Sequence, residues 1–268
     1  MDVDRVMHLI REVATAEIVP RFRSLAAGDI REKKPGDLVT IADIEAERRL
    51  TAALEAAAPG TVAIGEESVA ADPALLECLA GEVPVWIIDP IDGTGNFAKG
   101  RPRFAVIVAY VEGGVTNAGW IYDPLGRAMV WAQRRGGAFL EGNQLRLGGS
   151  ASDRRFAGSA YGRTAADVRA AKALTDTDRF AVKNHGCSGY EYMELARGGA
   201  DFTLHSRSLP WDHAAGMLII EEAGGVARFL DGSSYDPRVL DRKPLAAASA
   251  AAWQAVAAVM TAPAPTAA

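Results

Sequence analysis

Apolar positions follow helical spacing in some segments and strand-like runs in others, and this pattern predicts a mixed α/β protein. Apolar residues recur every three or four positions across residues 3–19, which is typical of an amphipathic helix that ends or kinks at Pro20. A second helical pattern covers residues 43–58, with Asp43 as the expected N-cap. Between these two helices, the polar stretch 28–37 predicts a loop.

Short apolar runs bounded by turn residues predict the strands of a β-rich middle region. These runs cover residues 61–65, 83–88, 104–111, 115–122, 128–133 and 138–147. Further helices are expected at 190–197, 213–223 and 250–261. A composition change near 148–153 divides the chain into an N-terminal α+β half, residues 1–149, and a C-terminal α/β half, residues 150–262. The tail 263–268 has no apolar face to bury, so we expect it to be disordered.

Charge and cysteine content narrow the class of protein. The chain has 268 residues and a net charge of −5, so no basic surface for nucleic acid is expected. With 49% hydrophobic and 24% charged residues, the composition is typical of a soluble globular protein. Cys78 and Cys187 fit neither a redox motif nor a disulfide framework, which favours a cytoplasmic location. The charged N-terminus predicts no signal peptide, and no apolar run reaches the roughly 18 residues of a membrane span.

The strongest chemical signal is the string DPIDGT at residues 89–94, which follows an apolar strand pattern. Asp89 and Asp92 would be held at the strand end, where both carboxylates can point into one cleft. Magnesium prefers such oxygen ligands and keeps room for waters and substrate phosphate. Gly93 allows close approach of the backbone, so its N–H and that of Thr94 are candidate phosphate donors. An acidic surface turn is the alternative, because Asp, Pro and Gly are ordinary turn residues.

Other acidic segments strengthen this interpretation when they are taken together. Glu66 and Glu67 follow a short strand pattern, and Asp212 stands at the start of the pattern 213–223. Each position alone has an ordinary explanation, because the glutamates fit a solvated loop and both Asp212 and Asp43 fit helix N-caps. Combined with DPIDGT, they predict a divalent metal site.

These strings resemble the inositol monophosphatase family, which also includes bisphosphate-sugar, histidinol-phosphate and phosphoadenosine phosphatases. The matches occur in the family's order and span nearly the whole chain. The combination of DPIDGT with a distant WD and EAGG is the most specific part. The matching strings are DLVT at 37–40, IGEES at 64–68, WIIDPIDGT at 86–94, WD at 211–212 and EAGG at 222–225.

The resemblance implies an α/β fold, a layered αβαβα sandwich of the inositol monophosphatase/fructose-1,6-bisphosphatase type. It implies a magnesium-dependent phosphatase with two or three Mg²⁺ ions that hydrolyses a small phosphorylated alcohol. Family members are often homodimers and often lithium-sensitive. By matching position, Glu66 and Thr94 would orient the attacking water, and Asp43 would hold the Thr94 hydroxyl. The implied metal ligands are Glu66, Asp89, the carbonyl of Ile91, Asp92 and Asp212. The resemblance also implies a catalytic role for Asp92.

The substrate end of the site departs from the inositol-specific pattern. Those members have a glutamate seven residues before the Trp-Asp aspartate, where this chain has His205, and residues 202–211 contain no glutamate. His205 and Arg207 therefore suit a more acidic substrate, although a solvated Arg207 is the alternative. Lys33 and Lys34 are expected in a solvated loop, with an approach to the metals or phosphate as the other possibility. The expected substrate contacts are Gly93, Thr94, Gly186, Cys187 (as a small filler), Ser188, His205 and Asp212.

Several alternatives remain open on sequence. Haloacid-dehalogenase phosphatases use a D-x-D motif with an aspartyl nucleophile, whereas the D-x-x-D spacing here favours water as the nucleophile. A non-catalytic, metal-binding family member is a further alternative, and the presence of every implied ligand argues against it. The substrate alternatives to an inositol phosphate-like or sugar phosphate are histidinol phosphate, fructose 1,6-bisphosphate and a 3′-phosphoadenosine nucleotide.

Overall fold

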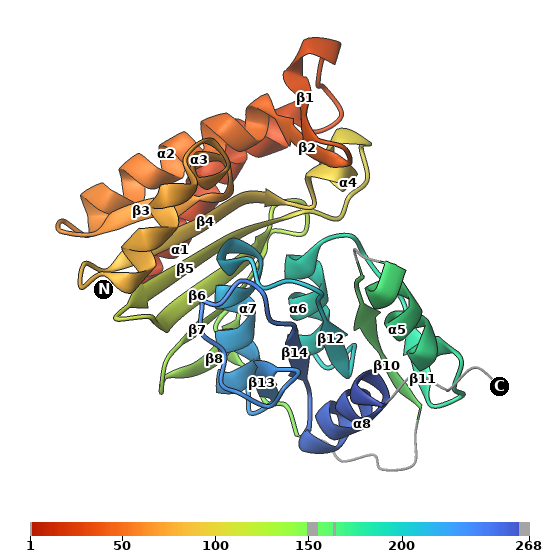
Figure 1. Ribbon diagram of the computed structural model, residues 1–268. Helices are drawn as coiled ribbons and strands as arrows, with labels where there is room; N and C mark the ends of the chain where they lie inside the picture. Colours follow the sequence, from red (N-terminus) through yellow and green to blue (C-terminus); the bar gives the residue numbers. More distant parts are fainter. Residues whose placement is uncertain (1, 149–154, 163–164, 263–268) are drawn as a thin grey trace.

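Five layers of secondary structure stack on one another in the computed structural model, which describes residues 2–148, 155–162 and 165–262 (Figure 1). One helix pair covers a large sheet, a second pair lies between the large sheet and a small sheet, and a third pair covers the small sheet. The predicted αβαβα sandwich is therefore confirmed. In layer order, the helices are α1 (Val3–Val13) with α2 (Ile41–Ala57), α6 (Ser188–Ala196) with α7 (Pro210–Glu222), and α5 (Ala165–Thr175) with α8 (Ala250–Thr261).

The large sheet carries the site. Within the described residues it has seven strands in sequence order, with β3 parallel to β4 and the remaining neighbours antiparallel. Its buried side chains alternate along β4, where Trp86 and Ile88 pack toward α1 and α2, and Ile87 packs toward α6 and α7. Because both faces are covered, β4 is apolar on both sides until its acidic end. The strands are β3 (Val62–Gly65), β4 (Val85–Asp92), β5 (Ala105–Glu112), β6 (Val115–Asp123), β7 (Ala128–Gln133), β8 (Gly137–Leu140) and β9 (Asn143–Gln144).

The small sheet has the order β11-β10-β12-β14-β13 among the described residues. On its outer face, Phe180 and Phe202 pack with Val256 of α8 in a separate core beneath α5 and α8. The predicted boundary near 148–153, apart from residue 148, and the predicted tail 263–268 lie outside the described residues, so the division into two halves stays a prediction. The strands are β10 (Phe156–Ala160), β11 (Phe180–Val182), β12 (Phe202–Leu204), β13 (Val226–Phe229) and β14 (Pro244–Ala247).

The predicted N-cap at Asp43 and the N-cap alternative for Asp212 are both wrong, because each helix begins earlier than expected. α2 is capped by Thr40, whose hydroxyl accepts a hydrogen bond from the N–H of Ala42, and the Thr40 N–H in turn donates to Asp43 Oδ2 at 2.8 Å. α7 starts at Pro210, a residue whose fixed φ suits the first helical position. Asp43 and Asp212 therefore lie inside first turns, where their carboxylates face the interior of the protein.

Other segments also differ from the sequence-based expectation. The polar stretch 28–37 is not a loop but carries a hairpin of β1 (Ile30–Lys34) and β2 (Asp37–Thr40), which turns at Gly36 with φ +80°. β4 continues through Asp92 with an irregularity after Asp89, instead of ending at residue 88.

Glu66 begins the short helix α3 (Glu66–Ala71), so the solvated-loop alternative for the glutamates is wrong. The first helix ends at Val13 and continues as a π turn (Ala14–Ile18) and a 3₁₀ turn (Val19–Arg21) that contains Pro20. A further 3₁₀ segment spans Pro73–Ala80, and α4 spans Thr94–Ala98. None of the described helices is both long enough and apolar enough to cross a bilayer.

Candidate active site

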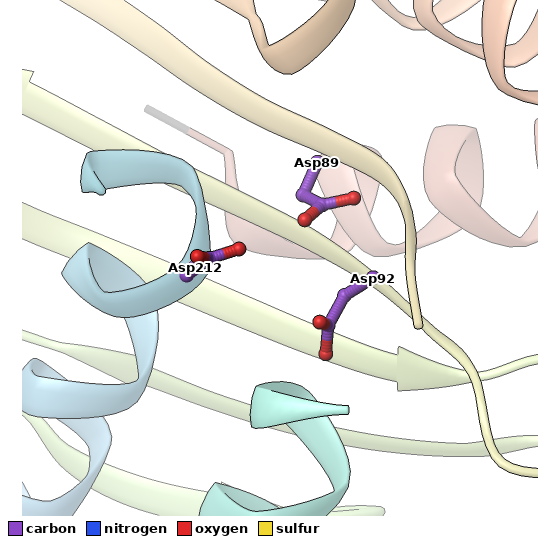
Figure 2. A group of neighbouring side chains, drawn as sticks. All are labelled: Asp89, Asp92 and Asp212. Carbon is purple, nitrogen blue, oxygen red and sulfur yellow. The ribbon is translucent and has the colours of Figure 1, made fainter. Parts of the chain in front are cut away.

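Three aspartates from two distant parts of the chain face one another at the end of β4. Asp89 and Asp92 come from β4, and Asp212 comes from the first turn of α7; Figure 2 shows their carboxylates turned toward a common point. One oxygen from each carboxylate lies within 4.8 Å of the other two. Asp89 and Asp92 are buried, whereas Asp212 is partly exposed. Since hard divalent cations bind carboxylate oxygens, this cluster has the donor set of a metal site.

The electrostatics of the aspartate cluster are unfavourable without a cation. Burial raises the pKa of Asp89 well above its ordinary value, and the charges of Glu66 and Asp92 raise it further. Burial likewise raises the pKa of Asp212 well above its ordinary value. The Oδ1 atom of Asp89 is buried and has no hydrogen-bond partner among the described residues. Buried charges are normally paired or bound to metals, so the cluster fits a divalent cation.

Asp92 links the cluster to the N-terminus of α6. Its Oδ1 accepts hydrogen bonds from the N–H and the hydroxyl of Ser188, at 3.2 and 3.0 Å. Its Oδ2 accepts from the Cys187 thiol at 2.9 Å and from the Gly189 N–H. Burial raises the pKa of Asp92, and these hydrogen bonds oppose the rise. Burial also raises the pKa of Cys187 well above its ordinary value, which supports the interpretation of Cys187 as a filler and not as a nucleophile.

A buried hydroxyl lies beside the cluster. Thr94 Oγ1 lies 3.1 Å from Asp43 Oδ1 and 3.0 Å from the carbonyl oxygen of Ile91. Burial raises the pKa of Asp43 to about 7, while hydrogen bonds from Thr40 and Thr94 oppose the rise. Gly93 is the N-cap residue of α4, with φ +87°, and a Cβ there would lie 3.0 Å from the carbonyl oxygen of Arg103. Glycine therefore permits both the backbone conformation and the close packing.

Lys33 reaches the site from the β1–β2 hairpin. Its ammonium group lies 2.8 Å from Glu66 Oε1 and 2.9 Å from Glu67 Oε1, so the solvated-loop expectation for Lys33 is wrong. Burial acts to lower the pKa of Lys33, but the two glutamates outweigh it and hold the pKa above its ordinary value. Burial raises the pKa of Glu66 despite Lys33, and raises that of Glu67 to about 7. Lys34, one residue further along, is exposed.

A cavity of about 180 Å³ opens next to the aspartates. It brings together most of the residues that were expected to contact substrate, although Gly93 and Thr94 are not part of its lining. Arg207, which was invoked for an acidic substrate, is exposed and also lies outside the lining. The lining residues are Asp92, Tyr161, Gly186, Cys187, Ser188, Glu191, His205 and Asp212.

The sequence matches the model of the inositol monophosphatase family over residues 3–263, which includes every residue of the site. The chain belongs to the inositol monophosphatase family. The match is consistent with the aspartate cluster and with the layered fold. The protein is accordingly a phosphoric monoester hydrolase of this family.

Relatives at moderate identity support the assignment. An inositol-1-monophosphatase of Mesorhizobium japonicum is 33% identical over 211 residues, 75% of each chain. A fructose-1,6-bisphosphatase/inositol-1-monophosphatase of Thermotoga maritima is 32% identical over 203 residues, again 75% of each. The solved structure of a Thermotoga maritima IMPase superposes with a TM-score of 0.82 over 96% of both chains, at 26% identity. The names of these relatives refer to more than one substrate, so membership of the family does not by itself identify the substrate of this protein.

The sequence did not single out two of the residues that line the cavity of this inositol monophosphatase family member. Glu191 lies in α6 and is 4% exposed, whereas Glu194 on the same helix is exposed. Nothing in the string SGYEYMELA separates the two glutamates, because both stand among apolar neighbours. Tyr161 follows β10 and is 48% exposed, and a lone aromatic residue gives no signal for a pocket mouth.

Proposed function

We propose that this protein is a magnesium-dependent phosphomonoesterase that hydrolyses a small phosphorylated alcohol by attack of water. The buried aspartate cluster, with the unpartnered Oδ1 of Asp89, is the observation that carries the proposal, because it calls for a compact oxygen-binding cation. Asp89, Asp92, Asp212, Glu66 and the carbonyl of Ile91 would hold two or three magnesium ions. When bound, such ions neutralise phosphate charge and lower the pKa of a coordinated water.

The chain's own groups would position the reactants. The Thr94 hydroxyl, held near Asp43 and the Ile91 carbonyl, would orient the attacking water together with Glu66. The backbone N–H groups of Gly93 and Thr94 would bind phosphate oxygens. The cavity beyond Asp92 and Asp212 would receive the alcohol. Positioning and charge stabilisation supply most of the rate enhancement in phosphoryl transfer, so this scheme needs no covalent intermediate.

Three further expectations belong to this proposal. Homodimers are expected from the family, and sedimentation analysis of the purified protein tests that state. A cytoplasmic location is expected from the two cysteines, neither of which is in a disulfide. Inhibition by lithium ions at millimolar concentration is expected, because lithium would compete for a site built for magnesium.

Phosphate release from a panel of esters tests the proposal. The panel contains inositol 1-phosphate, fructose 1,6-bisphosphate, histidinol phosphate, adenosine 3′,5′-bisphosphate and glycerol 1-phosphate, each with magnesium and with excess chelator. We expect release from at least one ester, lost with chelator and restored by added magnesium. Release that persists unchanged in chelator would contradict the proposal. If no ester is cleaved, calorimetry with magnesium separates an untried substrate from a scaffold that binds no metal.

A further inference from the structure

Glu47 of α2 caps the N-terminus of α3, the short helix that begins with Glu66. Its Oε2 accepts a hydrogen bond from the N–H of Glu67, and its Oε1 accepts one from the N–H of Ser68, both at 2.8 Å. Glu47 is 5% exposed. The first N–H groups of a helix have no partner within it, and the residue before α3 is Gly65, which has no side chain to supply one. A side chain of another helix therefore takes the place of the N-cap side chain.

Gly65 permits this contact because it leaves room for the Glu47 carboxyl group. A Cβ on residue 65 would lie 2.2 Å from Glu47 Cδ and 2.3 Å from its Oε2. The φ of Gly65 is −134°, a value that any residue adopts, so glycine is needed here for space and not for conformation. Ser68 also binds Gly65, since its hydroxyl accepts a hydrogen bond from the Gly65 N–H at 2.9 Å. The end of β3, the helix α2 and the first turn of α3 thus meet at one point.

The strand register places Glu66 beside the aspartate cluster. β3 is parallel to β4, and Gly65 pairs with Ile88, so Glu66 and Asp89 follow adjacent positions of the sheet. Burial is the main cause of the raised pKa of Asp89, and the nearby charge of Glu66 is the second. α3 has only six residues, and helices so short are not stable on their own. The position of Glu66 therefore depends on contacts that hold this turn from outside.

Side chains from two other elements bind the first turn of α3 in different ways. Lys33 binds its carboxylates, through Glu66 Oε1 and Glu67 Oε1, and so occupies an oxygen that a metal ion would use. Glu47 binds the backbone, through the N–H groups of Glu67 and Ser68. These backbone hydrogen bonds need not break when a metal ion replaces Lys33 at Glu66. Glu47 can therefore hold the turn both before and after metal binding.

We infer that Glu47 is a positioning residue, which holds the α3 turn so that Glu66 meets the metal ion in a fixed geometry that favours magnesium over calcium. This inference rests on the proposed function, because it takes Glu66 as a ligand of the magnesium site. Magnesium requires nearly ideal octahedral geometry, whereas calcium tolerates irregular sites and longer bonds. Groups that orient a metal ligand without touching the metal contribute about tenfold to a hundredfold to affinity or activity. A loosely held Glu66 should therefore weaken magnesium binding more than calcium binding.

Glu47→Gln tests the inference by changing one acceptor into a donor. A carboxylate accepts through both oxygens, but the amide nitrogen of glutamine only donates and would face an N–H group. We expect the Kd for magnesium, measured by calorimetry on the metal-free protein, to rise about tenfold or more. The Kd for calcium should rise less than about threefold. Unchanged magnesium affinity in folded Glu47→Gln would overturn the inference.

Glu55→Gln is the matched control. Glu55 lies on the same helix and accepts the N–H of Ala63 in β3 through one oxygen, at 3.0 Å, which the glutamine carbonyl can reproduce. Both Kd values should therefore stay within about twofold of the native values. A purely structural role of Glu47 would lower the fraction of protein that binds, or weaken both cations by one factor in Glu47→Gln. Either of these results would overturn the inference.

Gly65→Ala breaks the same contact from the other side. The added methyl group would push the Glu47 carboxyl group away from the α3 N–H groups, so the magnesium Kd should again rise about tenfold, with a smaller change for calcium. Native magnesium affinity in this variant would overturn the inference. A native protein that binds no magnesium would instead reject the proposed function, whereas native binding with no change in the variants rejects only the role of Glu47.

If neither variant folds, amide hydrogen exchange in the native metal-free protein decides the question. The second and third N–H groups of a helix have no partner within it, so protection of the Glu67 and Ser68 N–H groups reports the bonds to Glu47. We expect both to exchange at least about tenfold more slowly than in an unstructured chain, before any magnesium is added. Unprotected exchange of both groups would show that Glu47 does not hold the turn in advance of the metal, and would overturn the inference.

Discussion

At the metal end of the site, Asp89 leaves a buried oxygen without a partner, whereas at the alcohol end Glu191 is held by the His185 N–H and the Thr203 hydroxyl. The two carboxylates are similarly buried. Asp89 is buried beside other carboxylates, so its ionised form is unfavourable without a cation. Glu191 has its hydrogen bonds in place, and burial raises its pKa to about 7, so the carboxyl is partly neutral near pH 7. The first arrangement calls for a cation, whereas the second satisfies the carboxyl group within the protein.

Removing the unpartnered carboxylate should have the largest effect. Asp89→Asn should lower kcat about a thousandfold or more, because it removes a charge around which the metal site is built. The same change should raise the stability of the metal-free protein by about 1 kcal/mol, because it relieves repulsion among buried carboxylates. Phosphate release and thermal unfolding with chelator measure the two effects.

A buried aspartate outside the cluster serves as the control for Asp89→Asn. Asp123 accepts hydrogen bonds from the N–H groups of Leu125 and Gly126 through one oxygen, which asparagine can reproduce. Asp123→Asn should therefore leave kcat within about threefold of the native value. An Asp89→Asn enzyme with native kcat at low magnesium would show that Asp89 does not hold the essential ion.

The free energy of unfolding should depend on pH through buried carboxyl groups at both ends of the site. Burial raises the folded pKa of Asp43 from 3.8 and of Glu191 from 4.5, in each case to about 7. The folded protein then holds more protons than the unfolded chain between about pH 4 and 7, so the stability contributed by these groups falls as pH rises through that window. Chemical denaturation of the metal-free protein at a series of pH values measures this slope.

Added magnesium and the substitution Glu191→Gln should change different parts of this slope of stability against pH. Added magnesium should flatten the part of the slope that arises from the aspartate cluster, because the ion stabilises the ionised carboxylates. Glu191→Gln should flatten the remaining part by removing the titrating group, with or without magnesium. A metal-free protein whose stability rises steadily from pH 4 to 7 would contradict this electrostatic account of the site.

Lys33 should have an intermediate effect, because it supplies a cation to Glu66 and Glu67 at the edge of the metal site. Lys33→Met should destabilise the metal-free protein by about 1–2 kcal/mol, since it leaves partly buried carboxylates unpaired. It should also tighten magnesium binding about threefold to tenfold, because the ammonium group no longer competes for Glu66. Calorimetry measures the affinity, with the exposed Lys34→Met as control. Equal changes in both variants would mean that the contact with Glu66 has no role in metal binding.

Cys187→Ser should have the smallest effect. The hydroxyl can replace the thiol as a donor to Asp92 Oδ2, so kcat/KM should stay within about threefold. Cys187→Ala removes the donor and should lower kcat/KM about tenfold. Assays of both variants on the best ester measure the difference. An inactive Cys187→Ser enzyme would indicate that the thiol takes part in the chemistry.

The metal end was accessible from sequence because its residues lie in short strings with fixed spacing. DPIDGT and the distant WD predicted that Asp89, Asp92 and Asp212 would share one site, and the structure brings them together. The order of helices and strands was also largely predictable, because β4 and its neighbours are long apolar runs. The N-cap prediction for α2 failed, since propensity alone does not show whether Thr40 or Asp43 caps the helix.

The alcohol end was not accessible in the same way, because its residues come from separate elements that only the fold assembles. Tyr161 follows β10, Glu191 lies on α6 and His205 follows β12. The absence of a glutamate in residues 202–211 suggested a pocket without that carboxylate, yet α6 supplies one from a different part of the chain. The contact of Lys33 with Glu66 was similarly hidden, because it joins residues 33 positions apart in sequence.

Magnesium titration of the native enzyme and of Asp89→Asn tests the central claim most directly. Heat of binding and phosphate release would be followed in the same buffer, with the best ester of the panel. The account predicts that, in the native enzyme, phosphate release and magnesium binding reach half of their maximum at the same magnesium concentration. It also predicts that folded Asp89→Asn neither binds magnesium nor releases phosphate. Native-like phosphate release without bound magnesium, or binding unaffected by loss of Asp89, would contradict it.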